Sequence, residues 1–325
     1  MIVTVTLNPS LDLTYALSEP ALGAVDVHRA VSATVEASGK GVNVSLTLRR
    51  AGHNTVAVLP VGGATGRHLA ELLAAEQLAH ATVPVPGDTR INTSLLLGSG
   101  RTIKVNGPGT ELRSGDVDRL LGEVATVLSR LGRSASGPDE PSWLAVCGSL
   151  PPGVAPTVMG ALVDLAHGHA VRCVADVSGP ALGAALAAGA DLLAPNGLEL
   201  GQLLGVDLHA APLVDIARAA VGVARAEGPE LLVSLGADGA LFTDGSSILH
   251  GSGPVLVPVN TAGAGDAFLA GWLAVPGTSE ERMARALAFG RSACLSPHTV
   301  DPHPGSQGWD GITVTNVTQQ LEEGN

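Results

Sequence analysis

Short apolar segments alternate with helix-forming segments along most of this chain, and this alternation constrains the fold more than any other feature. The pattern becomes regular from residue 116 onward. Most of the apolar segments are four to six residues long and lack polar alternation, which is typical of strands that are buried on both faces. Strands separated by helices pair in parallel. The sequence therefore predicts an α/β fold whose mainly parallel sheet carries helices on both faces.

The predicted elements run through almost the whole sequence. The predicted strands cover residues 2–7, 54–60, 143–147, 171–176, 191–194, 231–235, 240–243 and 255–259. The predicted helices cover residues 42–51, 66–77, 116–131, 156–169, 180–188, 197–204, 213–227, 264–274 and 279–294. No internal repeat, low-complexity block or clear linker divides the chain, so we expect a single domain over residues 1–325.

Two β-rich segments, at about residues 9–36 and 83–106, interrupt the alternation. In the second, the runs INTSLLL and RTIKV meet at Gly98-Ser99-Gly100, which predicts a hairpin. We expect the two segments to form a small lid sheet that projects from the body over the carboxyl ends of the parallel strands, where α/β folds bind ligands. A plain extension of the main sheet is the alternative.

Composition excludes several classes of protein. The chain has 18 Lys and Arg against 30 Asp and Glu, a net charge of −12, and only seven aromatic residues, which argues against a nucleic-acid partner. Three cysteines without C-x-x-C spacing argue against a disulfide framework or a zinc site. No apolar run approaches the roughly 18 residues of a membrane span, and no basic leader precedes the first strand. We therefore expect a cytoplasmic protein without a membrane partner.

The segment Asn260–Leu269 (NTAGAGDAFL) separates a predicted strand from a predicted helix. Gly263, Ala264 and Gly265 can direct consecutive N–H groups at one point, where the helix N-terminus adds partial positive charge. Asp266, at the rim of this anion hole, can accept a proton from a nucleophilic hydroxyl. Phosphoryl transfer needs both functions. The alternative is that Asp266 only caps the helix.

Two common glycine motifs are absent. A G-x-G-x-x-G run in this segment would need glycine where Phe268 stands, and the first strand is followed by NPSLD, which argues against a dinucleotide-dependent oxidoreductase. A P-loop would need glycine at Thr34 and Ser or Thr at Gly41.

A second glycine-containing segment, Ser38–Asn43 (SGKGVN), also precedes a predicted helix. Gly39 and Gly41 would let the backbone approach a ligand closely. Lys40 and Asn43 offer polar contacts to a molecule rich in hydroxyls. An ordinary glycine turn with an exposed lysine is the alternative.

At these two segments the sequence resembles the PfkB (ribokinase-like) carbohydrate kinases. SGKGVNVSLTLRRAG is similar to that family's first signature, with Ser38 in place of its usual first glycine, and NTAGAGDAFLAG is similar to its second. Further similar segments follow in family order: TLNPSLD (6–12), TRINTS (89–94), TIKVNGPG (102–109), GSLPPG (148–153), DVSGPAL (176–182), PNGLEL (195–200) and SLGADGALF (234–242). The resemblance covers roughly residues 1–300 and implies a ribokinase-like three-layer fold with a small β-sheet lid.

The resemblance also implies roles for individual residues. Asp266 would be the catalytic base, assisted by the backbone of Gly263, Ala264 and Gly265. The residues implied in binding a sugar phosphate are Asp12, Gly39, Lys40, Asn43, Arg90, Lys104, Arg29 and Ser149. Those implied in binding the nucleotide are Asn196, Ser234, Gly236 and Gly239. Glu199 would hold Mg²⁺, the expected cofactor alongside ATP, directly or through water.

The sequence most resembles the branch of this family that converts D-fructose 1-phosphate and ATP to D-fructose 1,6-bisphosphate and ADP. The alternatives are a tagatose-6-phosphate kinase and a 6-phosphofructokinase. A non-catalytic sugar-phosphate sensor would be expected to lack the base or the anion hole, yet Gly263, Gly265 and Asp266 are all present. The expected partners are therefore a sugar phosphate and ATP, with a homodimer formed through the lid.

Overall fold

A computed structural model of the chain describes residues 1–18, 21–23, 27–131, 142–274 and 276–319. Its strands are β1 (Ile2–Val5), β2 (Ser10–Ala16), β3 (Ser32–Ser38), β4 (Thr55–Val61), β5 (Ala79–Pro84), β6 (Arg90–Leu96), β7 (Thr102–Asn106), β8 (Trp143–Cys147), β9 (Arg172–Asp176), β10 (Leu192–Leu193), β11 (Glu230–Ser234), β12 (Ala240–Thr243), β13 (Ile248–Ser252) and β14 (Thr313–Asn316). Its helices are α1 (Lys40–Arg50), α2 (Gly63–Ala75), α3 (Ser114–Leu131), α4 (Val158–Gly168), α5 (Pro180–Ala187), α6 (Gly197–Leu204), α7 (Leu213–Glu227), α8 (Ala264–Leu273) and α9 (Ser279–Leu295), with a short 3₁₀ turn at Gly236–Asp238.

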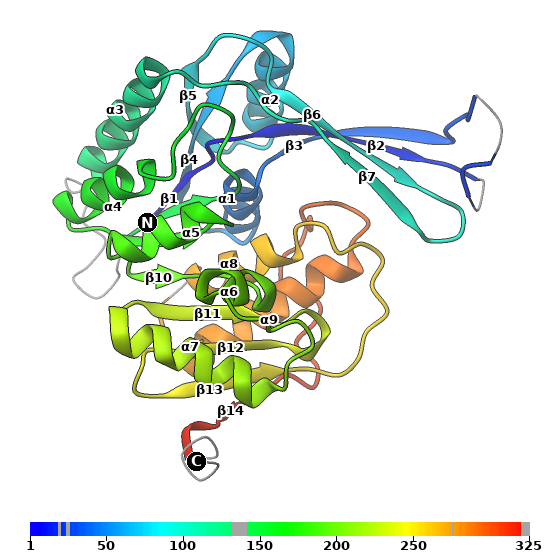
Figure 1. Cartoon of the computed structure of the whole chain (residues 1–325). Helices are drawn as coiled ribbons and strands as arrows, with labels where there is room; N and C mark the ends of the chain where they lie inside the picture. The colour runs from blue at the N-terminus through cyan, green and yellow to red at the C-terminus, as the bar shows by residue number, and fades with distance from the viewer. Residues whose placement is uncertain (19–20, 24–26, 132–141, 275, 320–325) are drawn as a thin grey trace.

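The larger of two sheets has ten strands in the order β14-β13-β12-β11-β10-β9-β8-β1-β4-β5 (Figure 1). From β11 to β5 the neighbouring strands pair in parallel, and β12, β13 and β14 extend the sheet in antiparallel fashion. The carboxyl ends of β1, β8, β9, β10 and β11 therefore meet at one edge. The segments that follow these strands, together with the loop that precedes α8, carry the candidate site.

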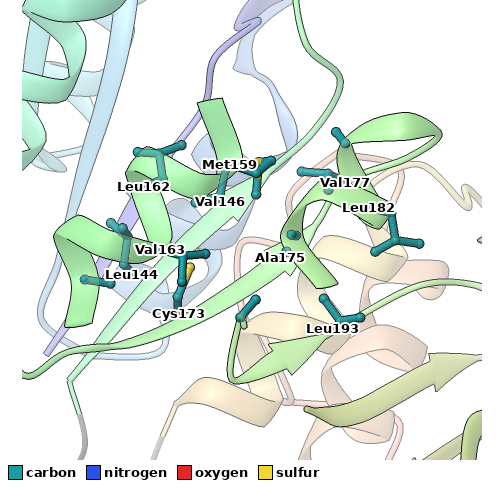
Figure 2. Packing of buried hydrophobic residues seen from close by; sticks show 14 of the residues in the cluster. Leu144, Val146, Met159, Leu162, Val163, Cys173, Ala175, Val177, Leu182 and Leu193 are labelled. Carbon is teal, nitrogen blue, oxygen red and sulfur yellow. The ribbon is translucent and has the colours of Figure 1, made fainter. Parts of the chain in front are cut away.

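Alternate residues of the parallel strands face opposite layers. Val3 of β1 and Leu144 of β8 lie in a buried cluster with residues of α3, α4, α5 and α7. Their chain neighbours Ile2 and Trp143 lie in a second cluster with α1, α8 and α9. Figure 2 shows the first cluster, in which α4 and α5 pack over β8, β9 and β10. The predicted three-layer α/β fold is thus confirmed.

A separate four-stranded sheet, the small sheet, has the order β3-β2-β6-β7 and projects to one side of the body (Figure 1). Strands β6 and β7 form the predicted hairpin. Its strand β2 pairs with β3 in antiparallel and with β6 in parallel. Of the second predicted lid segment, the first residues belong to β5 of the main sheet instead. Residues 19–20 and 24–26 of the first lie outside the described residues.

The predicted strand at residues 255–259 is wrong. The segment is irregular, and Val255, Val257 and Val259 are exposed by 100%, 86% and 65%. The segment is rich in valine, but Pro254 and Pro258 have no backbone N–H to contribute to a strand ladder. The strand of this region is β13, and its outer neighbour β14 comes from the C-terminal part, for which the sequence suggested nothing.

The helices of the described part are 8 to 18 residues long. The longest, α3, has 18 residues and carries Asp116 in its first turn and Arg130 in its last. Among the helices described, none combines the length and apolar character that crossing a membrane requires.

Candidate active site

The Asp266 carboxylate lies in the first turn of α8, directly after the glycine-containing loop. Gly263 caps this helix with φ +74°, in the left-handed region, and a Cβ there would lie 2.0 Å from the Thr299 carbonyl oxygen. Only glycine fits both conditions. The first N–H groups of a helix have no intrahelical acceptor. Ala264 N donates to the Thr261 carbonyl at 3.4 Å, which leaves the N–H groups of Gly265 and Asp266 available to an anion.

Asp266 is 6% exposed and accepts a hydrogen bond of 2.7 Å from Asn43 Nδ2, which comes from α1. Ser38 Oγ donates to Asn43 Oδ1 at 3.4 Å, which orients the amide so that its NH₂ group faces Asp266. Burial and the neighbouring Asp176 carboxylate raise the pKa of Asp266 to about 7, although the Asn43 hydrogen bond acts in the opposite direction. A carboxylate with this pKa can both take up and release a proton near neutral pH.

Lys40, at the start of α1, forms an ion pair of 2.8 Å with the buried Asp176, the last residue of β9. Partial burial disfavours the ammonium ion, but the Asp176 carboxylate, together with the charges of Asp266 and Glu199, outweighs this effect and raises the pKa of Lys40 above its ordinary value. Lys40 is therefore a fixed positive charge, and its side chain is 41% exposed.

A cavity of about 250 Å³ connects these charged groups. Lys40, Asp176 and Asp266 line it together with Asn196 and Glu199 from the start of α6. Asn196 and Glu199 form a reciprocal capping box: Glu199 N donates to Asn196 Oδ1 at 2.8 Å, and Asn196 N donates to Glu199 Oε2 at 2.9 Å. The α6 N-terminus is thereby held at the same cavity as the α8 N-terminus.

A second cavity, of about 370 Å³, adjoins the first, because Ser234, Gly265 and Phe268 line both. Its walls include Gly236 and Gly239 from the turn between β11 and β12. It then extends between the irregular segment after β13 and one face of α9. The two cavities form an elongated space that passes the N-terminus of α8.

The small sheet presents one polar face. Its strand register aligns Asp12 with Asn92 and Asn106, and the next row aligns Thr14 with Ser94 and Lys104. Asp12 Oδ1 accepts hydrogen bonds of 2.9 Å from Ser10 Oγ and from Asn92 Nδ2. Lys104 is exposed on β7.

Arg90 and Ser149 each form a hydrogen bond with Asn8, in the turn after β1. Arg90 Nη2 donates to the Asn8 carbonyl at 2.9 Å, and Asn8 Nδ2 donates to Ser149 Oγ at 3.2 Å. Arg90 Nη1 also donates to the Gly107 carbonyl at 3.2 Å, while Nε is buried without a partner among the described residues. Burial lowers the pKa of Arg90, which still remains a cation.

Comparisons with known proteins agree with this arrangement. The sequence matches the pfkB family carbohydrate kinase over residues 5–302. It belongs to this family.

Two relatives of this pfkB kinase are phosphofructokinases of different specificity. The 1-phosphofructokinase of Rhodobacter capsulatus is 33% identical over 312 residues, covering 93% of each chain. The ATP-dependent 6-phosphofructokinase isozyme 2 of Escherichia coli is 33% identical over 304 residues, covering 92% of this chain and 94% of the relative. A crystal structure of Escherichia coli phosphofructokinase-2 has a TM-score of 0.83 at 32% identity and covers 93% of this chain and 95% of that one. The chain is thus a sugar-phosphate kinase, which transfers a phosphoryl group to a hydroxyl.

The pfkB kinase contains two polar residues at this site that the sequence analysis left without a role. Asp176 ends a buried strand at the carboxyl edge of the sheet, a position that could have singled it out. Asn92 lies one strand away from Asp12, and its contribution becomes visible only once the pairing of β2 with β6 is known.

Gly39 and Gly41 of the kinase are required for a different reason than expected. A Cβ at Gly39, whose φ is +120°, would lie 2.7 Å from Thr6 Cγ2, and one at Gly41 would lie 2.5 Å from Thr6 Oγ1. Both glycines therefore let α1 start directly against the end of β1. The N–H groups at the start of α1 are placed near the site as a result.

Arg29 is not brought together with the other predicted sugar-binding residues. It is exposed in the connection between β2 and β3, beyond the Ala16–Ser32 pair. The Ser10–Ser38 pair, next to Gly39, lies at the other end of these seven-residue strands. At about 3.3 Å per residue this separation is about 20 Å, so the strand geometry holds Arg29 away from the cavity of its own chain.

The donors at the cavity suit a magnesium ion that travels with nucleotide phosphates. Mg²⁺ takes one or two carboxylates, phosphate oxygens and several waters. Glu199 and Asp176 both line the cavity, and Glu199 uses only Oε2 for the capping box. No cluster of three or more metal-ligating side chains occurs among the described residues.

Proposed function

We propose that this kinase phosphorylates D-fructose 1-phosphate with ATP, giving D-fructose 1,6-bisphosphate and ADP, and that Asp266 is its general base. One observation carries the proposal: a buried carboxylate with a raised pKa lies beside the free N–H groups of a helix N-terminus. The first group can take a proton, and the second can stabilise negative charge on a transferring phosphoryl group. The two are directly adjacent in the chain, in the second signature of the family.

In the proposed reaction, Asp266 accepts the proton of the sugar hydroxyl while the oxygen of that hydroxyl forms a bond to the γ-phosphorus of ATP. The bond between the γ-phosphorus and the bridging oxygen breaks, and its electron pair leaves with ADP. The segment Gly263, Ala264 and Gly265 would stabilise the charge that develops on the phosphoryl oxygens, chiefly through the N–H groups of Gly265 and Asp266, since Ala264 N donates to the Thr261 carbonyl. Lys40, held by Asp176, supplies a fixed positive charge to the same cavity.

The acceptor would lie between the start of α1 and the polar face of the small sheet. Asp12, Asn43, Lys40 and the Gly39 backbone would bind its hydroxyls, with Ser149 at the edge. Arg90, and then Lys104, would bind its phosphate, because these cations lie on the small sheet next to the Asp12 row.

ATP would occupy the elongated space formed by the two cavities. Ser234, Gly236 and Gly239 line it, and Asn196 and Glu199 stand where the phosphates would pass. Glu199 would hold the accompanying Mg²⁺ through water, and the ion would neutralise part of the phosphate charge. These substrates are charged and do not cross membranes unaided, so we also propose a cytoplasmic location.

The choice of acceptor is tested by a substrate panel. Fructose 1-phosphate, fructose 6-phosphate and tagatose 6-phosphate are each incubated with the enzyme, ATP and Mg²⁺, and ADP release is followed. The family branch indicated by the TLNPSLD, TRINTS and KVNGPG segments predicts the highest kcat/KM for fructose 1-phosphate. Turnover of one of the other sugar phosphates without turnover of fructose 1-phosphate would show that fructose 1-phosphate is not the acceptor.

We further propose a homodimer formed through the small sheet. The face opposite its polar rows carries Leu13, Tyr15, Ile91, Ile103 and Val105, of which Ile91 and Val105 are 43% and 62% exposed. An apolar sheet face of this kind is typical of a protein–protein contact. A structure of Escherichia coli phosphofructokinase-2 is described as a tetrameric inhibited form, so that relative assembles as an oligomer.

A further inference from the structure

Arg291, on α9, lines the larger of the two adjoining cavities and has no assigned role. Its side chain is partly buried, and its Nε is fully buried without a hydrogen-bond partner. Among the described residues it forms no salt bridge. A buried guanidinium nitrogen without a partner is costly, since its hydration is lost and not replaced. Because protein atoms cover Nε, a ligand can reach only the terminal Nη groups, which form no hydrogen bond within the described residues. The position therefore points to a partner that arrives with a ligand and binds these groups.

The surroundings of Arg291 place it away from the phosphate end of the space. Leu287, Gly290, Arg291 and Cys294 follow one another at helical spacing, so one stripe of α9 forms this wall. Gly290 contacts α8, because a Cβ there would lie 3.2 Å from the Ala264 carbonyl oxygen. The Arg291 guanidinium lies instead against Gly253, after β13, where a Cβ would be 2.8 Å from Nη1.

The remaining wall at this end is apolar, with Pro254, Val255, Leu256 and Pro258 opposite α9. Among the described residues that line the cavity, Arg291 is the only charged one. An apolar slot with one planar cation suits a flat heteroaromatic base rather than a phosphate, since the phosphates are already accounted for at the α8 N-terminus.

A guanidinium group donates only, and it does so through parallel N–H bonds. It therefore favours a base edge with two adjacent acceptors. Guanine offers N7 and O6 on one edge, whereas adenine offers N7 beside an amino donor. Cytosine has adjacent acceptors only at N3 and O2, next to the glycosidic bond, and uracil has no adjacent pair. A guanidinium placed for the N7 edge of a purine therefore meets no acceptor pair on either pyrimidine.

We propose that Arg291 is a specificity-determining residue of the nucleotide site, which binds the N7 edge of a purine and so admits GTP as phosphoryl donor beside ATP. This proposal rests on the proposed use of the elongated space by a nucleoside triphosphate. Arg291 contacts the base in both complexes, but it makes two hydrogen bonds to guanine and one to adenine. Loss of the side chain consequently affects GTP more than ATP.

The kinetic test compares Arg291→Met, which keeps the length but removes the donors, with Gly253→Ala, which leaves the charge and displaces the guanidinium. KM and kcat are measured for ATP, GTP and CTP. Wild-type enzyme should use GTP and discriminate against CTP. Both variants should raise KM for GTP about tenfold, the usual effect of losing a bidentate base contact, raise KM for ATP less, and leave kcat within twofold.

Arg130→Met, at an exposed position of α3, is the matched control and should behave as wild type. Melting temperatures show whether the variants fold. An equal rise of KM for all three nucleotides would mean that Arg291 only packs against Gly253, and it would overturn the proposal. The proposal would also be overturned if the ratio of KM for GTP to KM for ATP were the same in the variants as in the wild type.

Cys294 provides a second readout that does not depend on activity. It lies one turn from Arg291 on the same wall and is partly exposed, whereas Cys147 and Cys173 are buried. GTP and ATP should protect Cys294 of the wild type from alkylation by a maleimide, with peptide mass spectrometry as the measurement, and CTP should protect it less. Arg291→Met should weaken protection by GTP most.

Failure of GTP to protect the thiol would overturn the assignment of Arg291. A protein that phosphorylates none of the tested sugars, yet shows this order of protection, would contradict the proposed acceptor and still support the assignment.

Discussion

Asp266 is the residue on which the proposed chemistry depends most. Its carboxylate is buried, accepts a hydrogen bond from Asn43 and faces the charge of Asp176. Asp266 and Asn43 could be identified from the sequence, because both lie in segments with a glycine run before a helix. The place of Asp176 at the end of a buried strand marks it as a candidate, but its effect on Asp266 and its pairing with Lys40 follow only from the order β9-β8-β1, which brings the end of β9 near the start of α1.

Replacing Asp266 with Asn should lower kcat by a factor of about 10² to 10⁴, the usual contribution of a positioned general base. Asn43 can still donate to the amide oxygen, so the sugar phosphate should bind with nearly unchanged affinity. Steady-state kinetics and isothermal titration calorimetry measure the two quantities. Full turnover in the variant would rule out Asp266 as the base.

The pH dependence of the wild type follows from the same group. Below its pKa of about 7 Asp266 is protonated, so kcat/KM should fall about tenfold per pH unit on the acid side. Replacing Asp176 with Asn removes a negative charge near Asp266 and should move this limb to lower pH. A limb that stays in place would show that the titration belongs to another group.

Stability should respond to pH in a definite direction. The pKa of Asp266 is higher in the folded protein than in the unfolded chain, so ionising this carboxyl group costs more free energy in the folded state than in the unfolded state. The destabilisation is absent below the ordinary pKa of about 4 and grows until pH passes about 7. Asp266→Asn should remove this component. Urea unfolding at pH 5 and pH 8 measures the effect, because the free energy of unfolding should differ less between the two pH values in the variant than in the wild type.

At the scale of elements, the sequence predicted most helices and strands, because apolar strands and glycine-terminated helices leave strong local patterns. It failed at Val255–Val259, where the apolar residues line a cavity or face solvent instead of filling a sheet. It also missed β14, whose formation depends on β13 as a neighbour and not on a local pattern.

The start of α8 contains two glycines with different roles: Gly263 is needed for the fold, and Gly265 lines the cavity. Gly263→Ala would force a left-handed φ on alanine and place a Cβ 2.0 Å from the Thr299 carbonyl oxygen, so it should destabilise the protein by at least about 1–2 kcal/mol. Gly265→Ala meets no atom within 4 Å and should leave stability nearly unchanged. Its methyl group enters the cavity and should raise KM for ATP instead. Urea unfolding and kinetics distinguish the two, and similar effects of both variants would contradict the assignment.

At the scale of the whole molecule, the two faces of the small sheet suggest two different contacts. Polar rows continue from the site, while the opposite face exposes apolar side chains. The two β-rich segments of the sequence predicted the sheet. The assignment of faces needed the register, because a shift by one residue would exchange them.

Val105→Lys should convert the proposed dimer to a monomer, since it buries a charge in the apolar contact. Thr102→Lys, on the polar face of the same strand, is the matched control and should leave the dimer intact. Size-exclusion chromatography with light scattering measures the mass. A wild type that is already a monomer would refute the dimer.

The hydrogen bond between Asn43 and Asp266 has a consequence for how the enzyme is made. Its two partners are 223 residues apart in the chain. A ribosome adds about 5–20 residues per second, so about 10 to 45 seconds separate the synthesis of the two. For part of that time β1, an interior strand of the finished sheet, lacks its neighbour β8. A nascent chain therefore carries the sugar-side half of its site long before it can transfer phosphate, and premature release leaves a fragment without the base.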